Sequence, residues 1–122
     1  METSKATELK QRTKKFSLEI VNLFRVLPKT DEARIIGKQL LRSATSVGAN
    51  YRAVCRARSI AEFIAKIGIV VEEADESVFW LEMIIEGDIF NKENIHKLLK
   101  EANEILAIVA ASQKTAKENN RK

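Results

Sequence analysis

Small side chains fill a stretch of this sequence whose apolar residues recur at helical spacing. The stretch, residues 40–51, reads Leu-Leu-Arg-Ser-Ala-Thr-Ser-Val-Gly-Ala-Asn-Tyr. Gly48 costs about 1 kcal/mol of helix propensity relative to alanine, and serine and threonine are mediocre helix formers. Contacts with another part of the protein must therefore hold this helix together. The small side chains allow another backbone to come close to it.

Apolar residues recur every three or four positions along most of the chain, which predicts four helices. The expected helices cover about residues 7–27, 31–57, 60–86 and 92–112. Pro28 ends the first, and Thr30 and Ser59 are placed to cap the second and third. Four long amphipathic helices with short connections predict an all-α fold, an antiparallel up-down four-helix bundle in a single domain of residues 1–122. A polar, basic tail is expected after about Ser112.

Each predicted helix has a stripe of residues expected to face the core. In the first helix these are Leu9, Phe16, Ile20, Leu23 and Leu27; in the second, Leu40, Ala44, Val47, Tyr51 and Val54; in the fourth, Ile95, Leu98, Ala102, Ile105 and Val109. In the third they are Ile60, Ile64, Ile67, Val71, Ala74, Val78, Leu81 and Ile85. The third stripe has the most regular heptad spacing.

The third predicted helix carries more apolar surface than one bundle needs. At about 100° per residue, four further apolar residues point roughly opposite its core stripe. These are Ile69, Trp80, Met83 and Ile84. A second apolar face indicates a second partner, so we expect these residues to form an oligomer interface. The alternative is a set of scattered exposed apolar side chains, which are common on protein surfaces.

Charge is segregated between the second and third predicted helices. Residues 34–66 carry seven lysines and arginines against the single acid Glu62, whereas residues 72–88 carry seven acids and no base. Five of the bases fall within a sector of about 80° of the second helix, which we call the basic line. The basic line is Arg34, Lys38, Arg42, Arg52 and Arg56.

The basic line is expected to run about 33 Å at 1.5 Å per residue, close to the roughly 34 Å of one duplex turn. It could therefore follow a phosphate backbone. The alternative is a solvated face, or pairing of these residues with carboxylates of the third helix. A net charge of +4 and two further clusters favour a polyanionic partner. The clusters are Lys10, Arg12, Lys14 and Lys15, and Lys114, Lys117, Arg121 and Lys122.

Other classes of site have little support in the sequence. His96 is the only histidine and Cys55 the only cysteine, so no zinc-ligand spacing and no nucleophile with an evident base is present. We expect no catalytic residues, no metal and no cofactor. No apolar run approaches the ~20 residues needed to cross a bilayer. The expected setting is cytoplasmic, without a membrane partner.

The run Arg-Ser-Ala-Thr-Ser-Val-Gly-Ala-Asn-Tyr, residues 42–51, together with residues 52–57 and 72–81, resembles the four-helix-bundle family encoded by intervening sequences in bacterial 23S ribosomal RNA genes. The accessory variability proteins of diversity-generating retroelements look like its relatives. The resemblance extends from about Phe16 to about Val109. It implies assembly into a ring-shaped homopentamer and association with ribosomal RNA loci or retroelement machinery, but no established reaction. Ala53 departs from the glutamate that many of the similar proteins carry there.

These observations lead to one functional hypothesis and two alternatives. We expect a non-enzymatic oligomeric bundle that binds RNA or another nucleic acid through its basic surfaces. The first alternative is a protein-interaction scaffold, or an accessory subunit for a nucleic-acid enzyme such as a reverse transcriptase. The second is an enzyme with a site between subunits.

Overall fold

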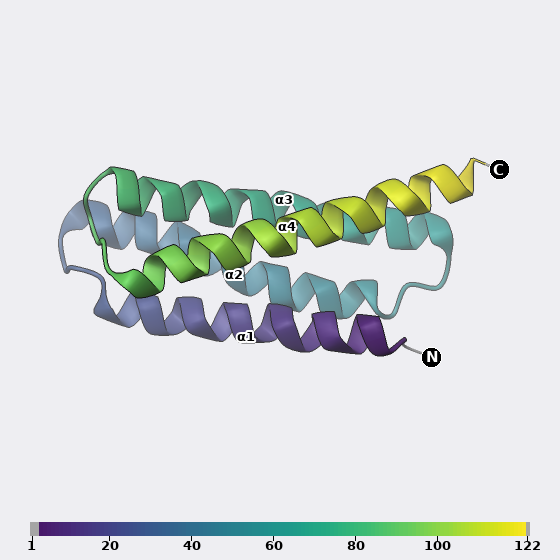
Figure 1. The fold of residues 1–122 in the computed structure, drawn as a ribbon, viewed down its shortest axis with the longest axis horizontal. Coiled ribbons are helices and arrows are strands. Elements are labelled where there is room, and N and C mark those ends of the chain that lie inside the picture. The colour runs from purple at the N-terminus through teal and green to yellow at the C-terminus, as the bar shows by residue number, and fades with distance from the viewer. Residues whose placement is uncertain (1–2, 122) are drawn as a thin grey trace.

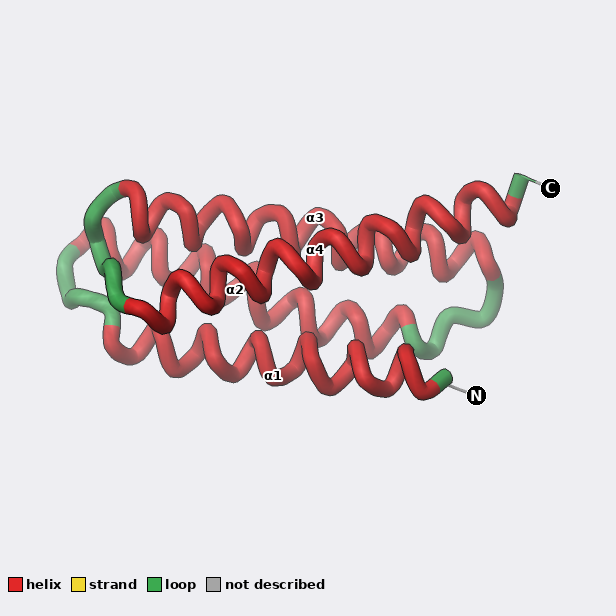
Figure 2. The backbone as a smooth tube through the Cα atoms, viewed as in Figure 1, coloured by secondary structure: helices red, strands yellow, loops and turns green. Residues whose placement is uncertain are grey.

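A computed structural model describes residues 3–121 of the chain as four helices, with no strand in that range. The helices are α1 (Ser4–Val26), α2 (Asp31–Val54), α3 (Ile60–Glu86) and α4 (Glu93–Asn120). Successive helices run in opposite directions and lie side by side (Figure 1, Figure 2). Each helix packs against the next, and α4 packs back against α1. The all-α, four-helix prediction is confirmed.

The predicted caps of α2 and α3 are formed. The Thr30 side chain accepts a hydrogen bond from the Ala33 N–H at 3.3 Å, and the Ser59 side chain accepts one from the Glu62 N–H at 3.0 Å. Each bond satisfies an N–H that has no partner inside its helix. The α2 and α3 starts therefore lie where the sequence places them.

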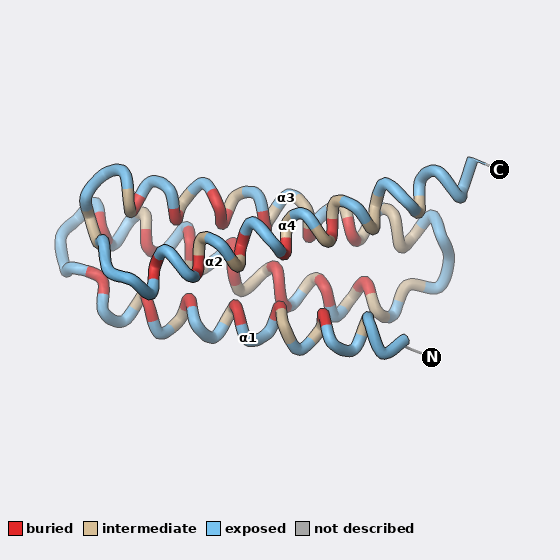
Figure 3. The backbone as a smooth tube through the Cα atoms, in the orientation of Figure 1, coloured by how far each residue is buried: buried red, intermediate tan, exposed pale blue. Residues whose placement is uncertain are grey.

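The core runs along the length of the bundle, with the buried positions facing inward on all four helices (Figure 3). Every residue of the predicted stripes in α1, α2 and α4 is buried. The largest fully buried side chains include Phe16, Leu40 and Ile105, from three different helices. Packing of these stripes, more than helix propensity, stabilises the bundle.

The prediction of which face of α3 is buried, which we call the phase of the helix, is partly wrong. Ile84, expected on the outer face, has 0% of its surface exposed, whereas Ile60 of the expected core stripe is 53% exposed. The buried positions of α3 are Ile67, Val70, Ala74, Ser77, Val78, Leu81 and Ile84. Val71 and Ile85 are half-buried at the edge of this stripe.

The buried serine Ser77 explains the shift. Its hydroxyl lies 2.9 Å from the Ser43 hydroxyl of α2 and donates to the Glu73 carbonyl, also at 2.9 Å. Because its hydroxyl is hydrogen-bonded, burial carries little penalty. The core stripe can therefore pass through a polar residue that apolar spacing alone excludes.

The small-residue stretch of α2 lies against α1, as its composition predicts. A Cβ added to Gly48 would lie 2.7 Å from Ser17 Oγ and 3.3 Å from the Thr13 carbonyl oxygen. Ser17 Oγ donates a hydrogen bond across the helix pair to the Ala44 carbonyl at 2.7 Å. Glycine at position 48 is thus required by the close approach of the two helices.

Three helix termini differ from the predicted ones by three or more residues. α1 begins at Ser4 instead of about Thr7. α2 ends at Val54 instead of Ala57, and α4 continues to Asn120 instead of ending near Ser112. The added turns of α4 contain no proline or glycine, and Gln113 Nε2 donates to the Ile64 carbonyl of α3 at 3.4 Å. A polar composition alone does not end a helix when its residues are good helix formers.

Candidate nucleic-acid interface

Four residues of the predicted basic line are exposed and have no acidic partner among residues 3–121. Arg34, Lys38 and Arg52 lie on α2, whereas Arg56 lies in the turn that follows it. Arg34 Nη2 donates to the Lys29 carbonyl at 3.0 Å, which leaves its charge uncompensated. These four side chains can meet an external anion without first giving up an ion pair.

Arg42, the fifth member of the basic line, behaves differently. Its guanidinium bonds Glu73 at 3.3 Å and, at closer range, Glu76, both on α3. This is the pairing alternative that the charge pattern left open, and it applies to this residue alone within the line. Arg42 therefore links α2 to α3 and is a poor candidate for phosphate binding.

The predicted basic cluster on α1 is also divided. Arg12 donates two hydrogen bonds to Glu101 at 2.7 Å and one to Glu104 at 2.8 Å, which links α1 to α4. The hydrogen bonding of Arg12 to the Glu101 carboxylate is the main reason that the pKa of Arg12 lies above its ordinary value. Lys14 is exposed and makes no ion pair with any residue in the described range.

The bases that follow the basic line are paired as well. Lys66 Nζ lies 3.1 Å and Arg58 Nε 3.8 Å from carboxylate oxygens of Glu62. The hydrogen bond from Lys66 lowers the pKa of Glu62 below its ordinary value. Beyond this group, Lys114, Lys117 and Arg121 lie exposed at the end of α4 or just after it, and Lys122 lies outside the described residues.

A shallow hollow, which we call the α1–α2 trough, lies beside Lys14 and Arg52. Its volume is about 270 Å³. It is lined by Lys14, Ser17, Leu18, Val21, Thr45, Gly48, Ala49 and Arg52. Leu18 lies outside the core stripe of α1 and is 56% exposed. This leucine on the polar face of the helix is the sequence signal that could have located the trough, and the sequence analysis did not single it out.

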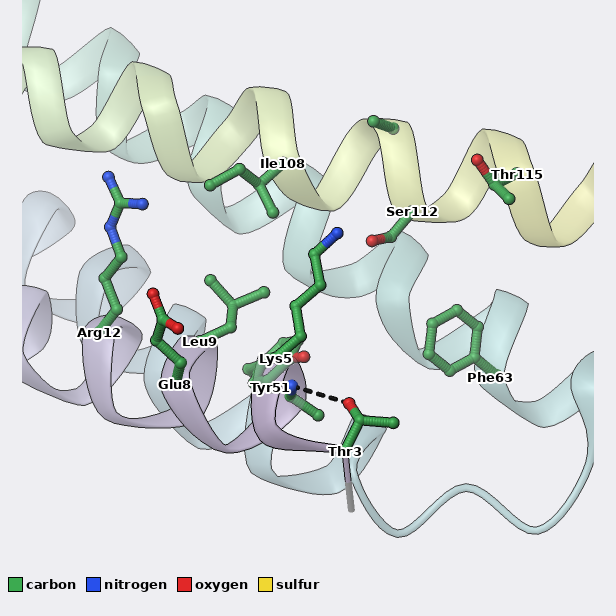
Figure 4. A pocket seen from close by; sticks show the side chains of 12 residues that line it. Thr3, Lys5, Glu8, Leu9, Arg12, Tyr51, Phe63, Ile108, Ser112 and Thr115 are labelled. Carbon is green, nitrogen blue, oxygen red and sulfur yellow. Dashed lines mark hydrogen bonds between the residues drawn. The ribbon is translucent and has the colours of Figure 1, made fainter.

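A second opening lies where α1 and α4 separate, near the start of α1 (Figure 4). It measures about 530 Å³, and Leu9, Phe63 and Ile108 line it from three helices. The Lys5 side chain extends from α1 toward α4 across it. The lining contains neither a histidine nor a cysteine.

Cys55 and His96 lie at opposite ends of the bundle. Cys55 follows α2, at the turn into α3, whereas His96 lies in the first turn of α4 (Figure 1). His96 Nε2 is 2.5 Å from Asn91 Oδ1 at the surface. Within residues 3–121, no group of three or more His, Cys, Asp or Glu side chains is arranged to hold a metal ion. None of the described helices is both long and apolar enough to span a bilayer.

The four residues predicted to form an oligomer interface do not all lie on the outer face of α3. Ile69 and Met83 are exposed, Trp80 is half-buried against the core, and Ile84 belongs to the core. Phe79, which the sequence analysis did not include, is 48% exposed and packs edge-on against Trp80 with ring centroids 4.8 Å apart. Apart from Ile60 at its first position, the exposed large apolar residues of α3 are thus Ile69, Phe79 and Met83, which we call its outer face.

Comparisons with known proteins agree with this architecture. The sequence profile described as 23S rRNA-intervening sequence protein matches residues 5–111. A solved structure of a protein of unknown function from the S23 ribosomal protein family of Bacteroides thetaiotaomicron is 34% identical, with a TM-score of 0.79. The match covers 87% of this chain and 98% of that chain. A comparison with functionally curated proteins finds no match. The chain therefore belongs to the 23S rRNA-intervening sequence protein family.

Proposed function

We propose that this protein is a cytoplasmic, non-enzymatic bundle that binds RNA or another nucleic acid through phosphate contacts. The observation that supports this most is the set of exposed cations on and beside α2 without acidic partners in residues 3–121. They are Lys14, Arg34, Lys38, Arg52 and Arg56. Phosphate oxygens are the usual partners of such side chains at nucleic-acid interfaces.

The dimensions of this surface suit a phosphate backbone. From Arg34 to Arg52 the helix rises about 27 Å at 1.5 Å per residue, most of one duplex turn of about 34 Å. Lys14 adds a charge from α1, at the other side of the trough. Arg12 and Arg42, whose ion pairs link different helices of the bundle, lie outside this set.

Binding should show the salt dependence of counterion release. With an RNA hairpin, an unrelated single strand and duplex DNA, log affinity should fall linearly with log salt, by about 0.7 to 0.9 for each phosphate neutralised. Sequence preference should be weak, because phosphate contacts do not read sequence. Fluorescence anisotropy from low to moderate salt measures both. If the protein binds none of the three nucleic acids at low salt, the proposal is excluded.

The alternative is a scaffold whose basic line docks an acidic protein, such as a surface of a reverse transcriptase. The exposed apolar residues on α3 favour some protein contact. Polyglutamate in the same titrations separates the two. Binding of polyglutamate but not of RNA at equal salt would favour the scaffold.

We infer further that the chain forms homo-oligomers through the outer face of α3. Family resemblance implies a ring, in particular a pentamer. Met83→Glu places a charge in an apolar contact and should yield monomers, because an unpaired charge is costly to desolvate. The matched control is Val26→Glu, at a position 58% exposed on α1. Multi-angle light scattering at micromolar concentration gives the masses, and a monomeric parent or an unchanged Met83→Glu mass would contradict the inference.

A further inference from the structure

The α1–α2 trough combines an apolar surface with two cations on opposite helices. Lys14 comes from α1 and Arg52 from α2, and no acidic side chain lines the trough. Neither cation makes an ion pair within the described part of the chain. Leu18, Val21 and Ala49 supply apolar surface between them. The chemistry that fits is a small apolar body with an anionic group on either side.

The trough lies over the point where the two helices approach closely, at Gly48. Because this residue has no Cβ, the α2 backbone meets α1 directly. Beside it, α2 contributes the small side chains of Thr45 and Ala49 to the lining of the trough. Larger side chains at these positions would fill the space. The volume of the trough is about 270 Å³. A helix with its side chains is about 10–12 Å in diameter, so even a short helix would not fit into the trough.

We propose that the α1–α2 trough holds an unstacked base of single-stranded RNA, with Lys14 and Arg52 on the phosphates that flank it. The inference rests on the proposed function and adds the form of nucleic acid that the surface takes. Bases in single strands and loops can be splayed out onto a protein surface, whereas duplex bases stay stacked inside the helix. Single strands and loops should therefore bind more tightly than a duplex of equal phosphate number.

Filling the trough tests the inference without changing charge. Ala49→Gln places a longer neutral side chain in it, and Ala107→Gln makes the same change at an exposed site on α4. We expect Ala49→Gln to weaken single-stranded RNA binding, because the added side chain occupies the space that the base would take. Its salt slope and its affinity for duplex DNA should match those of Ala107→Gln.

An abasic strand of equal length provides a second test, because it keeps the phosphates but lacks the bases. The parent protein should bind it more weakly than the intact strand, and Ala49→Gln should bind both strands equally. Equal affinity of the parent for intact and abasic strands would overturn the inference, as would equal behaviour of the two glutamine variants.

The proposed function is judged separately, by Lys14→Gln and Arg52→Gln. If these variants reduce the salt slope while the parent binds intact and abasic strands equally, phosphate binding stands and the base site is wrong. If they leave both affinity and slope unchanged, this face does not bind phosphates, and both the base site and the assignment of phosphate binding to it fail.

Discussion

Ile84→Ala should lower the free energy of unfolding by about 2–5 kcal/mol, the usual cost of truncating a fully buried aliphatic side chain. Met83→Ala, one residue earlier on the same helix, should cost much less because Met83 is 40% exposed. The two variants distinguish the observed phase of α3 from the phase that its apolar spacing predicts, in which both side chains point outward.

Urea denaturation followed by circular dichroism measures both values, at one fixed protomer concentration because self-association would shift apparent stability. Light scattering on the same samples is the control. A small loss of stability for Ile84→Ala, accompanied by a lower oligomer mass, would instead place Ile84 in an interface.

The phase of α3 could not be read from its own sequence. Ile67, Ala74 and Leu81 fit two overlapping stripes, one continuing through Val71 and the other through Val70. Apolar spacing favours the first, because the second contains a serine. The second is correct because Ser77 finds its partner on α2, 34 residues away in the chain. Side-chain partners on another helix are invisible to a pattern read along one helix.

The parts of the fold that depend on local chemistry were predicted well. The Thr30 and Ser59 caps involve residues three positions apart, and the stripes of α1, α2 and α4 contain no comparable ambiguity. The small residues around Gly48 correctly indicated a close helix contact, but not which helix would supply it. The length of α4 was underestimated because its polar end was interpreted as a tail.

The candidate site was also predicted only in part. Helical spacing placed four cations on an exposed surface, but it did not identify Arg42 as paired, because Glu73 and Glu76 lie 31 and 34 residues away. The trough depends on the register of α1 against α2, so Lys14 and Arg52 could not be brought together from sequence alone. Long-range contacts decide which charges remain available for a partner.

Removing positive charge on and just after α2 should have the largest effect on nucleic-acid binding. Lys38, Arg52 and Arg56 changed together to glutamine should reduce the magnitude of the salt slope by about two to three units, since each lost phosphate contact removes about 0.7 to 0.9. Affinity at low salt should fall accordingly. Glutamine keeps a long, helix-compatible side chain, so the circular dichroism spectrum should not change.

Arg42→Gln is the matched control for Arg52→Gln, because each removes one charge from an exposed position on α2. Arg52→Gln should reduce the slope by about 0.7 to 0.9. Arg42→Gln should leave the slope nearly unchanged and cost about 0–1 kcal/mol of stability, as expected for a solvent-exposed ion pair. Equal slope changes would mean that only net charge matters. The α2 surface would then attract polyanions without contacting individual phosphates.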